Sequence, residues 1–418
     1  MRRIVIRENI CEGMKEFEIY TLENGIRGIH RQVRSGVAHC ALVVNAGSRD
    51  EHKREYGIAH FTEHALFKGT ERRKAYQVNC RLENLGGALN AYTTKEDTTL
   101  HATVLRHDFR RAVELVADVI FRSTFPEREL NKEREVIADE INSYKDSPAE
   151  RIYDDFEDMM FRGSELGHNI LGSKASIARF STDEIRSFVG RTYTTDQMVF
   201  SSIGNFSVAT ARGIAERYLA GFEPTVRGFR REATAAYKPF SETLSRHTHQ
   251  AHGIIGTRGY SIADERRLPL ALMVNILGGP SANSLLNILL REKYGLSYNV
   301  EATYTPYSDT GIVGIYFSSD HDNVAQCVEL IEAEIAKLRS ELVTPRRLAI
   351  AKRQFVAQMA ISMEANEGYM LGAGKSLLLY KDIDTLEEAY KKVMAITAED
   401  IRSVAEDSFA HLSRLIYR

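Results

Sequence analysis

Polar and apolar residues alternate in several short stretches of the chain, and this period of two predicts β-strands. The strands are expected at residues 17–22, 26–30, 38–46, 88–94 and 98–105. Between and after them, apolar residues spaced by three and four predict helices. The helices are expected at residues 75–85, 109–121 and 127–144, with Asp108 as the cap of the second. Strands and helices therefore follow one another through the first third of the chain.

Residues 57–70 predict a short helix that is closed by Gly69, since glycine commonly ends a helix. Residues three and four apart share a helix face, so His60, Glu63 and His64 project together. Two imidazoles one turn apart can chelate one metal ion. Histidines on a half-apolar helix are more often packed or solvated than metal-bound, so this pentapeptide alone leaves both interpretations open.

The second half of the sequence repeats the first. The residues around Leu82 match those around Leu290, which lies 208 residues later. The residues around Ile185 match those around Ile401 at an offset of 216. A drift of a few residues in the offset is what small loop insertions in a duplicated domain produce.

We therefore predict two domains: a metal-bearing domain at residues 1–222, a linker at residues 223–243 and a homologous domain at residues 244–418. The linker is inferred from glycine, proline and basic residues without periodicity. The expected fold class is α+β, with two homologous α/β domains produced by internal duplication. Each should hold an antiparallel-rich sheet with helices packed on one face.

Composition narrows the function. The chain has 418 residues, 43% of them hydrophobic, and a net charge of -2, so no basic surface for nucleic acid is expected. The sequence has no run of 18 apolar residues, so no membrane span is predicted. The four cysteines show no metal-binding spacing, and the first residues show no apolar segment typical of a secretion or transit signal. We expect a cytoplasmic protein with reduced thiols. The cysteines are Cys11, Cys40, Cys80 and Cys327.

The two copies differ where the chemistry is expected. At equivalent positions the second copy has Leu268 and Leu272 in place of the two histidines and Gln358 in place of Glu140. A purely structural role should be shared by both copies, so this difference favours a site in the first copy. Glu133 and Glu140 share a face of the 127–144 helix, although a solvated edge would explain that pattern as well.

The motif formed by His60, Glu63 and His64, with Glu140 placed 76 residues after His64, resembles that of the inverted zincins. This is the family of pitrilysin, insulin-degrading enzyme and mitochondrial processing peptidase, and the chain resembles its short bacterial processing-peptidase-like members. The resemblance implies one zinc ion per chain on His60, His64 and Glu140, with Glu133 as a supporting carboxylate. It implies an endopeptidase that cleaves extended or unfolded peptides by attack of a metal-bound water, with Glu63 as general base.

The same resemblance implies two further contributions to substrate binding. Asn90 and Ala91 fall where relatives present an edge strand to the substrate backbone. Arg291 and Tyr298 match the pair that holds substrate near the scissile bond, and a tyrosine hydroxyl can stabilise an oxyanion. Because longer relatives close four such units round a chamber, a chain with two units is expected to form a homodimer.

Other interpretations stay open at this point. The same family supplies non-catalytic core or scaffold subunits, and a zinc-dependent peptide-binding protein without turnover would carry the same ligands. Manganese and cobalt are compatible with the donors as well as zinc. The histidines at 247, 249 and 252 are better explained by a histidine-rich strand at the start of the second domain than by a metal site.

Overall fold

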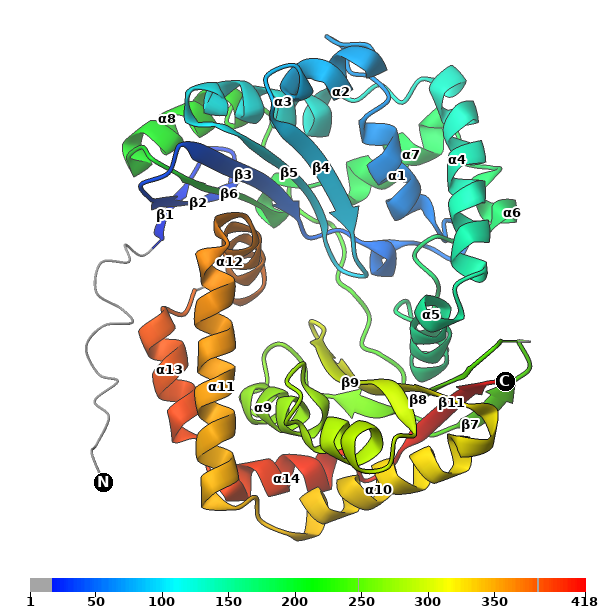
Figure 1. Ribbon diagram of the computed structural model, residues 1–418. Coiled ribbons are helices and arrows are strands. Elements are labelled where there is room, and N and C mark those ends of the chain that lie inside the picture. The colour runs from blue at the N-terminus through cyan, green and yellow to red at the C-terminus, as the bar shows by residue number, and fades with distance from the viewer. Residues whose placement is uncertain (1–16, 247, 382) are drawn as a thin grey trace. The chain divides into compact units, whose positions relative to one another are not determined.

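The computed structural model describes residues 17–246, 248–381 and 383–418 (Figure 1). Cys11 and His247 lie outside these residues. The elements of the first half are β1 (Glu18–Thr21), β2 (Arg27–Gln32), β3 (Val37–Val44), η1 (Ser48–Asp50), α1 (Ile58–Leu66), α2 (Ala75–Glu83), β4 (Ala88–Thr93), β5 (Thr98–Leu105), η2 (Arg106–Asp108), α3 (Phe109–Arg122), α4 (Glu127–Lys145), α5 (Pro148–Met160), α6 (Lys174–Ile177), α7 (Thr182–Thr192), η3 (Thr195–Gln197), β6 (Met198–Gly204) and α8 (Val208–Leu219).

The elements of the second half are β7 (Ser241–Leu244), β8 (Ala251–Gly259), α9 (Arg267–Gly278), η4 (Asn287–Lys293), β9 (Ser297–Pro306), β10 (Gly311–Ser319), η5 (His321–Asn323), α10 (Val324–Ser340), α11 (Pro345–Glu364), α12 (Asn366–Tyr380), α13 (Leu386–Ala395), α14 (Ala398–Ser408) and β11 (Ser413–Tyr417).

Two sheets with the same strand order confirm the predicted duplication. The first runs β1-β2-β6-β3-β5-β4 and the second runs β7-β11-β8-β10-β9. In each sheet one pair is parallel, β2 with β6 and β7 with β11, while the other neighbours are antiparallel. Apart from the extra strand β1, the sheets correspond strand for strand. The α+β fold with antiparallel-rich sheets is therefore confirmed.

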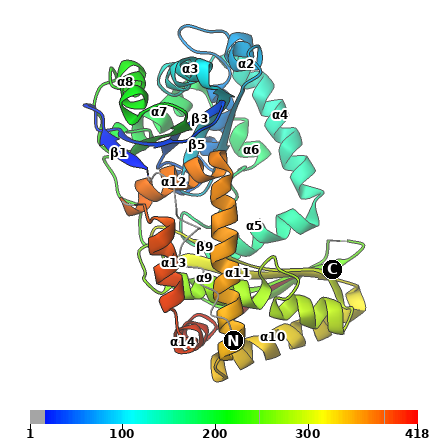
Figure 2. The same cartoon turned by 60° about the vertical axis from the view of Figure 1, so that its left-hand side comes forward.

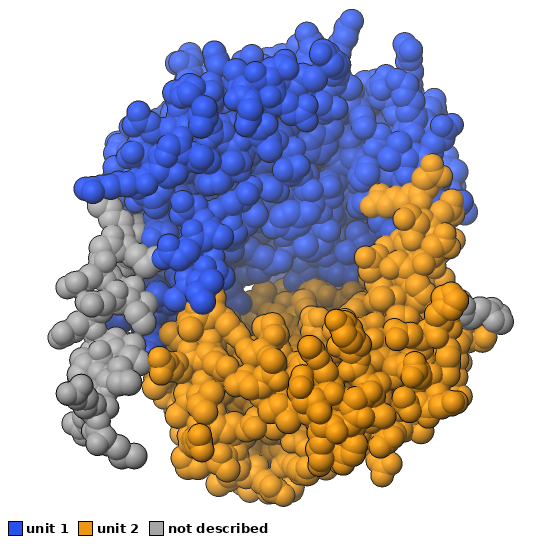
Figure 3. Space-filling view, viewed as in Figure 1, with its two compact units in different colours: residues 1–138, 170–231, 360–390 blue, residues 139–169, 232–359, 391–418 orange. Residues whose placement is uncertain are grey.

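The first compact unit comprises Met1–Ala138, Ile170–Arg231 and Ala360–Tyr390 (Figure 3). Its sheet carries α3 and α8 on one face and α12 on the other (Figures 1 and 2). Helix α12 packs Ala373 and Leu377 against Ile29, Val43 and Val199. The expectation of helices on one face only therefore needs correction, because a helix from late in the sequence covers the second face.

The second unit comprises Asp139–Asn169, Glu232–Met359 and Lys391–Arg418. Helices α9, α10 and α14 pack on one face of its sheet, and α5 covers the other. Helix α5 places Ile152 and Phe156 in one apolar cluster with Ile254, Leu415 and Tyr417. Each unit thus takes one covering helix from outside its own contiguous sequence. The boundaries expected at residues 222 and 244 stay a prediction.

Two local expectations were wrong. Asp108 precedes α3, but its side chain makes no cap hydrogen bond and instead pairs with Arg111 at 2.7 Å. Strand β8 begins at Ala251, so of the two described histidines of the predicted strand His249 lies before it and His252 belongs to it. The His252 ring bonds the Tyr316 hydroxyl at 2.8 Å, which gives it a partner within the sheet.

Candidate metal centre

Helix α1 begins at a buried carboxylate. Glu51 is 3% exposed and accepts hydrogen bonds from the backbone N–H groups of Gly57 and Ala59, at 2.9 and 2.8 Å. These N–H groups lie at the helix start, where the helix itself offers them no carbonyl partner. Gly57 has a φ of 100°, and a Cβ there would come within 2.9 Å of the Leu171 carbonyl oxygen. Glycine is therefore required where the chain enters α1.

The other end of α1 differs from the prediction. The helix ends at Leu66, three residues before the expected terminator, and Gly69 turns the chain with a φ of 130°. Beyond it, Thr70 donates to the buried carboxylate of Asp118 at 2.7 Å, and Arg73 pairs with the same carboxylate at 2.6 Å. Both ends of the helix are thus fixed by buried polar contacts.

His60, His64 and Glu140 form a group that could hold a metal ion, with ligand atoms within 4.8 Å of one another. The two imidazole rings lie 4.6 Å apart between centroids. Glu140 comes from α4, a continuous helix of 19 residues whose Glu133, about two turns earlier, touches His64. Donors bound at about 2.1 Å to one ion are at most about 4.2 Å apart, so the group needs only small movements to close on zinc.

Glu133 and Lys68 fix the orientation of the His64 ring. The Glu133 carboxylate lies 2.8 Å from His64 Nδ1 and 2.5 Å from Lys68 Nζ, and it is only 6% exposed. Burial alone would raise the pKa of Glu133, but the hydrogen bonds from His64 and Lys68 outweigh it and lower the pKa. An ionised carboxylate only accepts, so Nδ1 carries the proton and Nε2 keeps its lone pair for a metal.

The pKa of His60 is lowered to about 3 by burial, with a smaller contribution from His64. The imidazole is therefore neutral at physiological pH, which is the form that binds metal. Glu63 lies on the same helix between the two histidines and is half-buried. The structure thus provides two imidazoles, of which that of His60 is neutral, one carboxylate donor and a neighbouring carboxylate that can accept a proton.

Asn90 and Ala91 lie on β4, the edge strand of the first sheet, and pair with His101 and Leu100 of β5 on their inner side. Helix α1 packs against this strand. An edge strand has backbone N–H and C=O groups available for another extended chain. The predicted substrate strand is therefore an edge next to the helix that carries the histidines.

Arg291 and Tyr298 lie together in the second unit. The Arg291 guanidinium stands 5.6 Å from the centroid of the Tyr298 ring, and the tyrosine is 84% exposed. Arg291 belongs to η4, a π-helical segment, and Tyr298 to the edge strand β9. Long π-helical segments are rare and occur often at functional sites. Both side chains are thus displayed to solvent beside each other.

Comparison with known proteins decides the family. The family model described as Insulinase (Peptidase family M16) matches residues 30–174, and that of the peptidase M16 inactive domain matches residues 179–355. The chain is 32% identical over 397 residues to the "Uncharacterized zinc protease YmxG" of Bacillus subtilis, covering 93% of this chain and 95% of that protein. The chain belongs to the M16 peptidase family.

Other M16 relatives agree. An "Uncharacterized zinc protease" of Streptomyces coelicolor is 30% identical over 399 residues, covering 93% of this chain and 86% of the relative. Two solved structures share the fold at 19% identity. A protease from Helicobacter pylori has a TM-score of 0.86 and covers 97% of this chain and 100% of its own. A peptidase M16 inactive domain from Pseudomonas fluorescens has a TM-score of 0.89 and covers 96% of this chain and 98% of its own. Among the described helices, none is long and apolar enough to cross a membrane.

Sequence reasoning gave no role to two residues around this candidate centre. Lys68 follows His64 by four positions, but only the folded chain shows that it neutralises Glu133. Glu51 lies six residues before Gly57, outside the helix whose first N–H groups it accepts, and only the folded chain shows this contact. The signal for Lys68 was its place one turn after a ligand candidate.

Proposed function

We propose that the chain is a zinc-dependent endopeptidase that cleaves extended or unfolded peptides. The observation that carries this proposal is the group of His60, His64 and Glu140 beside Glu63, in a chain of the M16 peptidase family. Relatives that match 93% of the chain are named zinc proteases, which favours zinc as the metal. The one donor set found among the described residues corresponds to one zinc ion per chain.

In this proposal His60, His64 and Glu140 hold zinc, while Glu133 and Lys68 keep the His64 ring in place. The metal supplies a Lewis acid that polarises the scissile carbonyl and makes water a better nucleophile at neutral pH. Glu63 accepts the proton of the attacking water and delivers it to the leaving amine. The burial of His60 limits the access of bulk water to this donor.

Substrate is held by its backbone. A peptide in extended conformation pairs with β4 at Asn90 and Ala91, because no other described strand lies beyond this edge of the sheet. Arg291 anchors a backbone carbonyl, and the Tyr298 hydroxyl donates to the oxyanion that develops on the scissile carbonyl. Backbone pairing makes unfolded segments better substrates than folded domains.

The decisive test is cleavage of an unstructured peptide library by the metal-loaded protein. We expect cleavage that stops with a chelator and returns with zinc. Glu63→Gln should bind zinc with the same stoichiometry and lose at least about a thousandfold in kcat, since it removes the proton acceptor. If the loaded protein and Glu63→Gln are equally inert across the library, the chain is a scaffold or peptide-binding protein.

We propose further that the protein is a homodimer enclosing a chamber, in which Arg291 and Tyr298 serve the metal centre of the partner subunit. Glu63→Gln and Arg291→Ala proteins should each be nearly inactive when pure. If the site is shared, mixed dimers with one subunit of each kind regain up to about half of the activity per dimer, because one of the two sites is intact. No recovery in verified mixed dimers would refute the shared site.

A further inference from the structure

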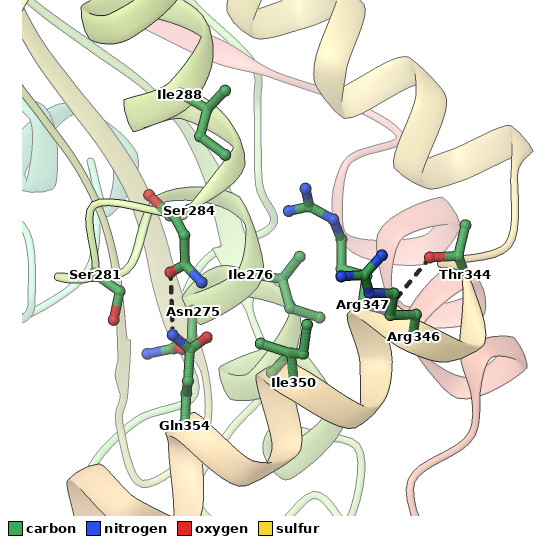
Figure 4. A pocket seen from close by; sticks show the side chains of 12 residues that line it. Asn275, Ile276, Ser281, Ser284, Ile288, Thr344, Arg346, Arg347, Ile350 and Gln354 are labelled. Atoms are coloured by element: carbon green, nitrogen blue, oxygen red, sulfur yellow. Dashed lines mark hydrogen bonds between the residues drawn. The ribbon is translucent and has the colours of Figure 1, made fainter. Parts of the chain in front are cut away.

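The second unit also contains a pocket, and none of the residues that line it is a candidate metal donor. A pocket of about 330 Å³ opens between α9, the segment that leads into η4, and the first turns of α11. Its volume is within the range of small-ligand sites. All of its lining residues belong to the second unit. The three kinds of chemistry that line it are separated in space (Figure 4).

One wall is formed by amides and hydroxyls. Asn275 and Gln354 lie on this side with Ser281 and Ser284 (Figure 4). Their positions are fixed, because Asn275 donates to Gln358 at 3.0 Å and Gln354 donates to Asn283 at 3.1 Å. Side-chain amides present both donors and acceptors, which is what a peptide group requires.

The floor is apolar. Ile276 and Ile350 lie between the two walls in Figure 4, with Ala351 among the lining residues and Ile288 at the far side. Ile276 is 4% exposed, whereas Ile350 and Ile288 are 44% and 40% exposed. An apolar group that covers these exposed isoleucines removes apolar surface from water, which favours binding.

The opposite wall is cationic. Arg346 and Arg347 lie on the Thr344 side of the pocket, in the first turn of α11 (Figure 4). Among the described residues, no carboxylate forms an ion pair with either guanidinium. The start of a helix carries partial positive charge, so two arginines there oppose the helix dipole. This wall therefore holds positive charge that the surrounding protein leaves unneutralised.

We propose that this pocket binds the C-terminal carboxylate of a peptide whose last side chain is apolar. The carboxylate pairs with Arg346 and Arg347, the last side chain covers Ile276 and Ile350, and the preceding peptide group bonds Gln354 and Asn275. This occupant uses all three walls at once, whereas an inorganic anion would use only the arginines. The site is separate from the proposed metal centre and does not depend on catalysis.

The test uses two fluorescein-labelled pentapeptides that end in leucine, one with a free C-terminal carboxylate and one with an amide. Both are titrated into the full-length Glu63→Gln protein and followed by fluorescence anisotropy. The acid should bind about tenfold to a hundredfold more tightly than the amide, because it gains charged hydrogen bonds to arginine. The Arg346→Gln/Arg347→Gln protein should lose this preference.

Two single variants distinguish binding in the pocket from binding elsewhere on the protein. Arg353→Gln removes an exposed arginine of the same helix outside the pocket and should leave the preference intact. Ile350→Glu should weaken acid binding through charge repulsion while keeping the arginines, and unfolding midpoints show whether each variant is folded. Equal binding of acid and amide, or a preference that survives the double arginine variant, would overturn the proposal. Displacement of the acid by equimolar inorganic phosphate would also overturn it, in favour of a general anion site.

Discussion

Replacing Glu133 by glutamine tests how the metal donors are held. The carboxylate accepts the proton of His64 Nδ1 at 2.8 Å and pairs with Lys68 at 2.5 Å. Glutamine can still accept from His64 through its carbonyl, but its NH₂ group then faces the Lys68 ammonium, donor against donor. The ring loses its charged partner, and Lys68 is left without one at this position.

Loss of a partner of this kind typically weakens metal binding by about 10–100-fold, which corresponds to about 1.4–2.7 kcal/mol. We therefore expect Glu133→Gln to raise the Kd for zinc by that factor, measured by competition with a chromogenic chelator. Glu135→Gln changes an exposed carboxylate two residues away and should leave the Kd unchanged. If Glu133→Gln is folded and binds zinc as tightly as the parent protein, Glu133 does not orient His64.

Three further predictions concern stability, measured by urea denaturation of the metal-free protein. Gly57→Ala should destabilise the protein by about 1–3 kcal/mol, because Gly57 has a φ of 100°. Gly213→Ala, at an exposed position within α8, should stabilise it by about 0.5–1 kcal/mol. If both variants change the unfolding free energy in the same direction, the prediction fails. Arg231→Met leaves buried Asp50 without its cation and should cost about 3–5 kcal/mol, whereas Arg212→Gln, in an exposed pair, should cost less than about 1 kcal/mol. Burial lowers the pKa of His30, so the folded state binds fewer protons than the unfolded state and stability is lost as pH falls below about 6.5. His30→Gln should reduce this loss. An unchanged dependence of the unfolding free energy on pH would refute the prediction.

Local structure could be predicted from the sequence where a single pattern dominates. Strand β5 occupies the predicted residues 98–105, because its alternation serves one buried and one half-buried face. The duplication was readable because both copies keep the same order of elements. The ligand candidates on α1 were readable because helical spacing alone places His60 and His64 on one face.

Contacts between segments far apart in the chain could not be predicted from the sequence. The apolar residues of α12, such as Ala373 and Leu377, predict a buried helix but do not say which sheet it covers. The failed cap at Asp108 has a related cause, since Arg111 is close enough to take the carboxylate by a charged contact. Arg231 gave no periodic signal, yet it is buried against Asp50 from a segment without regular structure. In each case the partner is chosen by the tertiary fold.

The second copy shows why the donors of the first favour a cation. Helices α9 and α11 correspond to α1 and α4, and Gln358 stands where the first copy has Glu140. Gln358 accepts from Asn275 at 3.0 Å and donates to Ser281 at 3.3 Å, so neutral groups satisfy one another. In the first copy, Glu133 and Glu140 bring two carboxylates to the two histidines, with Lys68 as one cation. A bound divalent ion would balance the remaining negative charge there, whereas the amide pair of the second copy has no charge to balance.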